Sequence, residues 1–346
     1  MILVTGGTGF LGSRLLQELV GSGKEVRCLY RKSILKNVPV ETAKYIDWQE
    51  ADLLDVVSLE EVLSGVDRVY HCAGVVSFDP GNRKEMQAVN VTGTTNLVNA
   101  CIAKGVDKLV HVSSVAALGR AAGRTAIDES CRWEDSRNNT AYALTKHLGE
   151  MEVWRGIGEG LKAVIVNPSI LIGSSQSWDD ASAGLIRNVY DEFPWYTKGV
   201  NGFVNVQDVT RAMIVLMEGD VTAERFILNG NNWSYQQLFA TIHHHLGKEN
   251  RQKYAAPWMG EIIWRLERLQ SLMTRRPPRV TREMAKTARL KVYYDHSKIK
   301  RFLPGFEFTS LEKTIAETCS AFLQYKEKQN RQDESATKTV QHIDSA

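Results

Sequence analysis

The chain begins Met-Ile-Leu-Val-Thr-Gly-Gly-Thr-Gly-Phe-Leu-Gly, residues 1–12, and this stretch decides the fold class. Its first five residues form an apolar run typical of a buried parallel strand. Residues 13–20 continue with leucines at helical spacing, so a helix follows the glycines. A tight turn from strand to helix needs glycine where φ is positive or where the backbone approaches a ligand. Because amides at a helix start attract phosphate, the stretch predicts an α/β fold that binds a dinucleotide.

The glycines of this turn have an unusual spacing. They lie at Gly6, Gly9 and Gly12, a G-x-x-G-x-x-G pattern, whereas the common dinucleotide fingerprint is G-x-G-x-x-G. A glycine-rich turn without a ligand is the alternative interpretation. The strand before the turn and the helix after it favour a dinucleotide.

The residues after the second predicted strand indicate which dinucleotide binds. Residues 25–30 are strand-like, and Arg31 and Lys32 follow directly. An NAD site normally has an acidic residue there for the ribose 2′-hydroxyl, whereas an arginine accommodates the 2′-phosphate of NADP. Two cations and no acidic residue favour NADP(H), and NAD(H) stays possible. A solvated basic loop is the alternative.

Strands and helices continue to alternate along the chain. Residues 44–48, 67–72 and 107–113 have strand patterns, and residues 56–63 have a helical pattern between the first two. This alternation is typical of a parallel sheet covered by helices. In such sheets, ligands bind outside the carboxyl ends of the strands.

Small and polar residues follow three of these strands. Asp52 lies just past the third strand, where its carboxylate could accept a hydrogen bond from the adenine amino group. Ala73 and Gly74 follow the fourth strand and allow a cofactor to approach the backbone. Ser113 and Ser114 end the fifth strand, where a serine can donate a hydrogen bond to a substrate carbonyl.

A tyrosine and a lysine come next, four residues apart. Tyr142 and Lys146 share one helix face if their segment is helical. An ammonium near a phenol favours the phenolate, so we expect Lys146 to lower the pKa of Tyr142 from about 10. Tyr142 is therefore a candidate proton donor or acceptor. The spacing alone is a weak signal, since it recurs by chance on solvated helices.

Taken in order, these motifs resemble the extended branch of the short-chain dehydrogenase/reductase superfamily. Within it, the chain is most similar to the dihydroflavonol-reductase-like and related NAD(P)-dependent epimerase/dehydratase proteins. The resemblance extends to about Lys326. It rests on residues 5–12, Asp52-Leu53, Ala73-Gly74, Asn90-Val91-x-Gly93-Thr94, Ser113-Ser114, Tyr142-x-x-x-Lys146, Asn167-Pro168-Ser169, residues 203–209 and residues 294–298. It implies a Rossmann doubly wound parallel sheet with a smaller, mainly helical C-terminal substrate lobe.

The resemblance also implies a catalytic triad of Ser114, Tyr142 and Lys146. Ser114 would polarise the carbonyl, Tyr142 would exchange a proton with its oxygen, and Lys146 would hold the nicotinamide ribose. Choosing Ser114 over Ser113 depends on how the residues that follow align. Asn90 would either orient the lysine through water or cap the next helix. The cofactor-binding residues it predicts are Gly6, Thr8, Gly9, Phe10, Leu11, Gly12, Arg31, Lys32, Asp52, Leu53, Ala73, Gly74, Asn90, Pro168 and Ser169.

The two expected lobes interleave along the chain. Residues 1–168 would form the NAD(P)-binding domain, to which residues 203–228 return. Residues 169–202 and 229–326 would form the substrate lobe. Residues 327–346 are polar and lack periodicity, which predicts a disordered tail.

The substrate lobe contains two ambiguous apolar features. The stretch 257–273 has an amphipathic helical pattern, which favours a lid or core helix, with a membrane-surface helix as the alternative because arginines surround the apolar face. The aromatic residues either shape an apolar substrate pocket or pack in the lobe core. They are Trp178, Trp195, Tyr196 and Phe203.

The composition of the chain indicates no particular class of binding partner. The chain has 346 residues, a net charge of +3 and five scattered cysteines, which suggests free thiols in a reducing, cytoplasmic setting. Nothing indicates nucleic-acid binding, and membrane contact is not favoured. The neighbouring histidines 243–245 point in different directions on a helix, so no metal site is predicted. The family resemblance makes a homodimer through helices near residues 90–103 and 142–154 possible.

Three functions are compatible with these motifs. The leading hypothesis is an NADPH-dependent reductase of a ketone or aldehyde on a small, fairly apolar molecule. A nucleotide-sugar epimerase or dehydratase with retained NAD is the second, with Arg279 or Arg289 as a possible diphosphate clamp. The third is a regulator that senses NADP(H) without turnover, which an intact Ser114, Tyr142 and Lys146 set disfavours.

Overall fold

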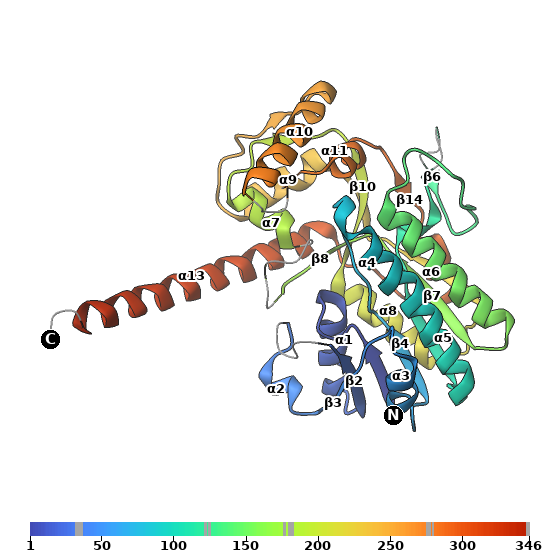
Figure 1. The fold of residues 1–346 in the computed structure, drawn as a ribbon. Coiled ribbons are helices and arrows are strands. Elements are labelled where there is room, and N and C mark those ends of the chain that lie inside the picture. The colour runs from blue at the N-terminus through green and yellow to red at the C-terminus, as the bar shows by residue number, and fades with distance from the viewer. Residues whose placement is uncertain are drawn as a thin grey trace.

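Figure 1 shows the computed structural model of the protein, which describes residues 1–31, 37–120, 123, 126–175, 178, 183–274, 278 and 280–343. A parallel sheet with helices on both sides forms the larger body, and a smaller lobe rich in helices lies at one end of it. The predicted fold class, a doubly wound α/β sheet with a smaller helical lobe, is confirmed.

The central sheet has seven parallel strands in the order β11-β7-β5-β4-β1-β2-β3. The strands are β1 (Ile2–Thr5), β2 (Val26–Tyr30), β3 (Ile46–Glu50), β4 (Arg68–His71), β5 (Lys108–Val112), β7 (Ala163–Pro168) and β11 (Glu224–Leu228). The chain builds outward from β1 in one direction and then from β4 in the other. The strand order therefore reverses between β1 and β4, and ligands bind such sheets beside this reversal point.

Apolar side chains alternate between the two faces of this sheet. Val4 belongs to one core with leucines of α1 (Phe10–Gly21) and with α8 (Val206–Glu218). Leu3 belongs to a second core on the opposite face. That core includes residues of α3 (Val56–Val62), α5 (Gly93–Lys104) and α6 (Ala141–Gly158). Both faces are covered, which explains why the strands have continuous apolar runs.

Short elements complete the larger body. They are α2 (Val40–Ala43), η1 (Pro80–Asn82), α4 (Arg83–Gln87), the single π-helical turn η2 (Ala88–Thr92), η3 (Val115–Leu118) and α12 (Ser297–Phe302). Strand β3 begins two residues later than the predicted strand, because Lys44 still caps the end of α2.

The smaller lobe is built on a three-stranded sheet in the order β12-β10-β8. Its strands and helices are β8 (Ile170–Ile172), β10 (Val200–Asn205), β12 (Asn231–Ser234), α7 (Ala183–Tyr190), α9 (Tyr235–His245), α10 (Pro257–Thr274), α11 (Arg282–Thr287) and the start of α13 (Leu311–Ile343). Two small parallel pairs join β9 (Trp195–Tyr196) to β13 (Lys253–Tyr254) and β6 (Ala126–Ile127) to β14 (Tyr293–Tyr294). Trp178 and Phe203 are buried in the core of this lobe.

The chain passes back and forth between the two lobes because β10 and β11 pair with strands of different sheets. Strand β11 pairs with β7 in the central sheet, whereas β10 pairs with β8 and β12. The return to the larger body is therefore made by α8 and β11, and residues 203–205 lie in the small sheet. The lobe boundaries themselves stay a prediction.

The C-terminal segment differs from the predicted disordered tail. The structure places residues 327–343 in α13, which projects from the body as a single long helix (Figure 1). The segment lacks an apolar stripe, which was the basis of the prediction, but it is rich in good helix formers. Arg331 and Glu327 also form an i,i+4 pair at 4.0 Å.

Helix α10 does not bury its apolar stripe as a core helix would. Trp258 is 65 % exposed, Leu266 60 % and Met273 80 %. The helix contacts α11 through its other side, where Trp264 lies near Arg282. Of the two predicted roles, packing as a core helix is wrong for this face, and a lid stays a prediction. No helix in the described ranges combines the length and the apolar character needed to cross a membrane.

Candidate active site

The turn between β1 and α1 requires glycine at two positions. Gly6 has a φ of +69°, and a Cβ there would lie 2.5 Å from the Ala73 amide nitrogen. A Cβ on Gly12 would collide with the Gly6 carbonyl. The turn therefore lies directly against the chain that follows β4, at the reversal point of the sheet.

The start of α1 presents backbone amides that precede its first helical hydrogen bond. Gly9 is the N-cap and supplies no side-chain acceptor, and the first helical hydrogen bond runs from the Ser13 amide to the Gly9 carbonyl at 2.9 Å. The amides of Phe10, Leu11 and Gly12 lie ahead of that bond, where a helix leaves its donors unsatisfied. Glycine-lined donors at a helix start fit a pyrophosphate, so these residues fit the dinucleotide that the sequence predicts.

Arg31 and Asp52 lie at neighbouring strand ends. Arg31 follows β2, and its two terminal nitrogens are each 3.9 Å from a carboxylate oxygen, one on Asp52 and one on Glu85. The guanidinium is about half exposed, so it can reach a ligand. Leu53 is buried against Gly93. Lys32 lies outside the described residues.

Asn90 holds the chain after β4 in place. Its Nδ2 donates to the Val75 carbonyl at 2.9 Å and to Thr145 Oγ1 at 3.0 Å, and its Oδ1 accepts from the Val75 amide at 2.7 Å. The predicted capping role is wrong, because Asn90 lies inside η2 and has no side-chain bond to a helix start. A Cβ on Gly74 would lie 3.3 Å from Asn90 Oδ1 and 3.7 Å from Lys146 Nζ. Gly74 therefore lies beside both groups, close to the end of β5.

The two serines at the end of β5 have different partners. Ser114 is the N-cap of η3, where its Oγ accepts from the Ala116 amide at 3.2 Å, and its side chain lies close enough to Tyr142 to lower the pKa of that phenol. Ser113 is buried, and its Oγ donates to Glu150 Oε2 at 2.7 Å. Of the two, Ser114 is the serine that meets the tyrosine.

Helix α6 brings Tyr142 and Lys146 to the same place. Thr140 caps the helix by accepting from the Ala143 amide at 3.0 Å, which fixes the first turn. Lys146 Nζ donates to the Val112 carbonyl at 2.7 Å, so the ammonium lies at the end of β5. Burial lowers the pKa of Lys146 to about 8, and the charge of Glu150 opposes that fall.

The pKa of Tyr142 corrects the prediction. Burial raises it above the usual value, and the hydrogen bond with Ser114 opposes that rise. We expected Lys146 to lower it, but the ammonium is directed to the Val112 carbonyl. In the protein without cofactor, Tyr142 is therefore a firmly protonated phenol at neutral pH, the form that a proton donor requires.

Known proteins match this arrangement. A sequence model described as the NAD dependent epimerase/dehydratase family matches residues 2–228, which hold the glycine turn, the serines and the Tyr142–Lys146 pair. The chain belongs to this family. It is therefore an NAD(P)-dependent enzyme of the extended short-chain dehydrogenase/reductase superfamily, as the sequence predicted.

Three relatives illustrate the match, and two of them are reductases by name. A putative dihydroflavonol 4-reductase of Synechocystis is 29% identical over 92% of this chain and 93% of its own length. Sterol demethylase protein B of Methylococcus capsulatus is 31% identical over 68% of this chain and 71% of its own. Cinnamoyl-CoA reductase 1 of Petunia hybrida is 31% identical over 66% and 72%.

Solved structures show the same fold. The crystal structure of gox2253 is 28% identical, with a TM-score of 0.77 over 94% of this chain and 98% of that one. UDP-glucose 4-epimerase of Thermotoga maritima has a TM-score of 0.75 over 94% and 99%, at 22% identity. At that identity the likeness concerns the fold alone.

In this family member, Glu150 accepts hydrogen bonds from three side chains beside the site, a role that the sequence analysis missed. The carboxylate is 1 % exposed. It accepts from Ser113, from Asn167 Nδ2 at 2.8 Å and from Arg225 Nη1 at 3.0 Å. Asn167 also donates to the Ser114 carbonyl at 3.0 Å. A carboxylate four residues after Lys146, on the same helix face, was the available signal.

A neutral histidine supports the strands under the glycine turn. His71 Nδ1 lies 2.7 Å from Thr5 Oγ1, and its Nε2 lies 2.9 Å from Thr94 Oγ1. Burial, and then the Lys146 charge, lowers the pKa of His71 to about 3. The Thr94 hydroxyl in turn donates to the Asn90 carbonyl at 2.9 Å. These bonds tie β1, β4 and α5 together beneath the turn.

Pro168 is the last residue of β7, and Ser169 follows it directly. Pro168 pairs with Leu228, and the Ser169 amide donates to the Leu228 carbonyl at 3.0 Å. Ser169 is buried behind Gly202 of β10. Their position near the nicotinamide stays a prediction.

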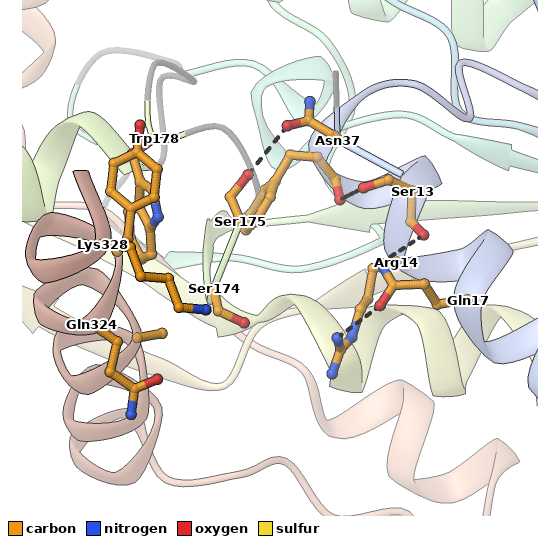
Figure 2. A pocket seen from close by; sticks show the side chains of 12 residues that line it. Ser13, Arg14, Gln17, Asn37, Ser174, Ser175, Trp178, Gln324 and Lys328 are labelled. Carbon is orange, nitrogen blue, oxygen red and sulfur yellow. Dashed lines mark hydrogen bonds between the residues drawn. The ribbon is translucent and has the colours of Figure 1, made fainter. Parts of the chain in front are cut away.

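A polar pocket of about 260 Å³ adjoins the start of α1 (Figure 2). Figure 2 shows Ser13, Arg14 and Gln17 on one side and Gln324 and Lys328 of α13 on the other. Asn37 lies between the two sides. It donates to the Thr8 carbonyl at 3.0 Å and is 3.4 Å from Ser175 Oγ, so it links the glycine turn to the segment after β8. Within the described ranges, no three His, Cys, Asp or Glu side chains are grouped to hold a metal ion.

Proposed function

We propose that the protein is an NADP(H)-dependent oxidoreductase that reduces a ketone or aldehyde on a small, fairly apolar molecule. The observation that carries the proposal is the closeness of Ser114 to Tyr142 at the end of β5, where the serine side chain acts on the pKa of the phenol, with Lys146 one turn further along α6. A carbonyl oxygen placed between the two hydroxyls would receive a hydrogen bond from each. The reductase names of the relatives support this reaction class.

Each side chain of the site has its own role in the proposed reaction. Bound nicotinamide supplies the hydride. Ser114 Oγ donates a hydrogen bond to the substrate oxygen and polarises the carbonyl. Tyr142 gives its hydroxyl proton to that oxygen as the alcohol forms. Since burial disfavours the phenolate, the positive charge of Lys146 is what would stabilise it after the transfer.

Arg31 supports NADP(H) over NAD(H). It lies at the end of β2, where a guanidinium can pair with a 2′-phosphate, and its present partners Asp52 and Glu85 are distant at 3.9 Å. Arg31→Ala should weaken NADPH binding about 10- to 100-fold and leave NADH binding nearly unchanged, because only a charged contact to the phosphate is lost. Titration of both cofactors measures this, with the exposed Lys44→Ala as the control. Equal losses for NADPH and NADH would contradict the choice of cofactor.

The alternative function is a nucleotide-sugar epimerase or dehydratase that retains NAD. The structure gives little support to the two arginines that were predicted to clamp the diphosphate of a nucleotide sugar. Arg279 lies outside the described residues, and Arg289 Nη2 is packed against Gly260 of α10. A regulator that only senses NADP(H) would have no use for the Ser114–Tyr142 pair.

The cofactor state of freshly purified protein separates these functions. Mass spectrometry of the released nucleotide and titration with NADPH and NADH are the measurements. Protein that is empty and binds NADPH reversibly supports a reductase, and turnover of an aldehyde library then tests the reaction. Tightly retained NAD would favour the epimerase or dehydratase. Reversible NADPH binding with no turnover of any carbonyl would favour the sensor.

A further inference from the structure

Helix α10 has an apolar stripe that the described part of the chain leaves exposed. Its members are Trp258, Ile262, Leu266, Leu269 and Met273, which are 48–80 % exposed. Their spacing of four, four, three and four residues places them on one side of the helix. Among the side chains that the structure describes, no other helix exposes more than two large apolar residues. An exposed stripe of this kind marks a surface that contacts an apolar partner.

The edge of the stripe and the residues after it are basic. Arg265 and Arg268 are exposed, and each precedes a leucine of the stripe, so both lie along the same edge. Glu261 shares this edge and pairs with Arg265 Nη1 at 3.1 Å. Residues 257–282 contain six arginines, two glutamates and no lysine or aspartate, a net charge of +4, whereas the whole chain carries +3. The excess positive charge of the protein is therefore concentrated in this stretch of sequence.

The position of α10 leaves the stripe accessible. Figure 1 shows α10 in the smaller lobe, at the side away from the central sheet. The helix contacts α11 through its other side, next to Trp264. Its 18 residues span about 27 Å, so the stripe is long and narrow. A flat surface could cover the whole stripe without meeting the central sheet.

An anionic lipid surface matches both the stripe and its charge. The apolar side chains of an interfacial helix enter the boundary of the acyl chains, while arginines keep their guanidinium groups at the level of the phosphates. A second copy of the chain fits less well. Five partly exposed side chains offer a few hundred Å², less than the roughly 800 Å² per partner of a standard interface, and two such helices would bring their arginines together.

We propose that α10 docks the protein on an anionic lipid surface, with its stripe in the acyl boundary and Arg265 and Arg268 among the phosphates. The sequence analysis did not favour membrane contact, because a core helix would have hidden the stripe. The exposure of Trp258, Leu266 and Met273 removes that objection. Docking through α10 leaves the central sheet clear of the lipid, and it does not depend on the proposed function.

Vesicle cosedimentation tests the docking. Vesicles of equal parts phosphatidylglycerol and phosphatidylcholine should bind the wild type, and vesicles of phosphatidylcholine alone should bind it about 10-fold more weakly or less. Leu266→Glu places a charge in the stripe and should weaken binding to the anionic vesicles about 10-fold or more. Arg268→Gln should weaken it about 5-fold. Val57→Glu, at a 68 % exposed valine of α3, is the matched control and should bind as the wild type does.

Two further measurements identify what covers the stripe. A blue shift of tryptophan emission on adding the anionic vesicles, reduced in Trp258→Phe, supports insertion of the stripe in lipid. No binding of the wild type to anionic vesicles, or equal binding of wild type and folded Leu266→Glu, overturns the proposal. In sedimentation equilibrium without lipid, a dimer that Leu266→Glu dissociates would show that a second copy covers the stripe, and this also overturns it.

Discussion

Helices α6 and α10 each have 18 residues and use them in opposite ways. Helix α6 buries Thr145, Lys146 and Glu150. Helix α10 exposes Trp258 and Leu266, large apolar residues that a core would normally take up. Helix α6 therefore has buried polar residues, whereas helix α10 has exposed apolar residues. At these positions, both helices depart from the usual pattern of buried apolar and exposed polar residues.

This difference shows that contacts with other elements decide which residues of a helix are buried. Each buried polar group of α6 has a partner from another element: Val112 for Lys146, Asn90 for Thr145, and Arg225 for Glu150. Burial of these groups is therefore tolerated, and it places them at the end of β5. For the apolar stripe of α10, nothing in the described ranges provides such a cover.

The largest expected effect concerns Tyr142 of α6. Tyr142→Phe removes only the hydroxyl, so turnover should fall about 10²- to 10⁴-fold while NADPH affinity changes little. Steady-state kinetics and NADPH titration are the measurements. A variant that loses NADPH binding together with turnover would show that Tyr142 acts in binding instead of proton transfer.

Glu150 tests whether the buried polar face of α6 is held by its partners. Glu150→Gln leaves Arg225 without a counter-charge, so the free energy of unfolding should fall by about 3–5 kcal/mol. Chemical unfolding measures the loss. Glu152→Gln on the same helix breaks only a surface pair with Arg155 and should cost about 0.5 kcal/mol or less. Equal effects of the two variants would refute this account.

The buried Lys146 of α6 should make the free energy of unfolding depend on pH. Its pKa is about 8 in the folded protein and near 10.5 when unfolded, so between these values the unfolded chain binds more protons. The contribution of this group to the free energy of unfolding should therefore rise with pH over that window, by on the order of 1–3 kcal/mol, and stay flat below pH 8. Unfolding of cofactor-free wild type and Lys146→Met at several pH values measures it. Parallel pH curves for the two proteins would show that the lysine is not buried as a charge.

The smallest expected effect is on α10. Leu266→Ala should change the free energy of unfolding by less than about 0.5 kcal/mol, because the side chain is already exposed. Val153→Ala in α6 removes two fully buried methyl groups and should cost about 2 kcal/mol. Thermal and chemical unfolding of both variants give the contrast. A cost for Leu266→Ala as large as that for Val153→Ala would mean that the stripe of α10 is covered in solution.

Much of the fold and part of the site could be predicted from short stretches. The β1–glycine–α1 turn, Arg31 after β2, and Tyr142 with Lys146 on one helix face all depend on neighbours within a few residues. Backbone conformation and side-chain periodicity are local, so the sequence alone determines such features. The ordered motifs also indicated the family correctly.

Other features depend on residues far apart in the chain, and only the tertiary structure decided them. Ser113 and Ser114 are adjacent in sequence, yet Glu150 takes one hydroxyl and Tyr142 meets the other. The rise in the Tyr142 pKa follows from burial, which its spacing to Lys146 does not report. Arg225 reaches Glu150 across 75 residues of chain. Desolvation and long-range pairing depend on which surfaces meet, and that is settled when the sheet, α6 and the smaller lobe pack together.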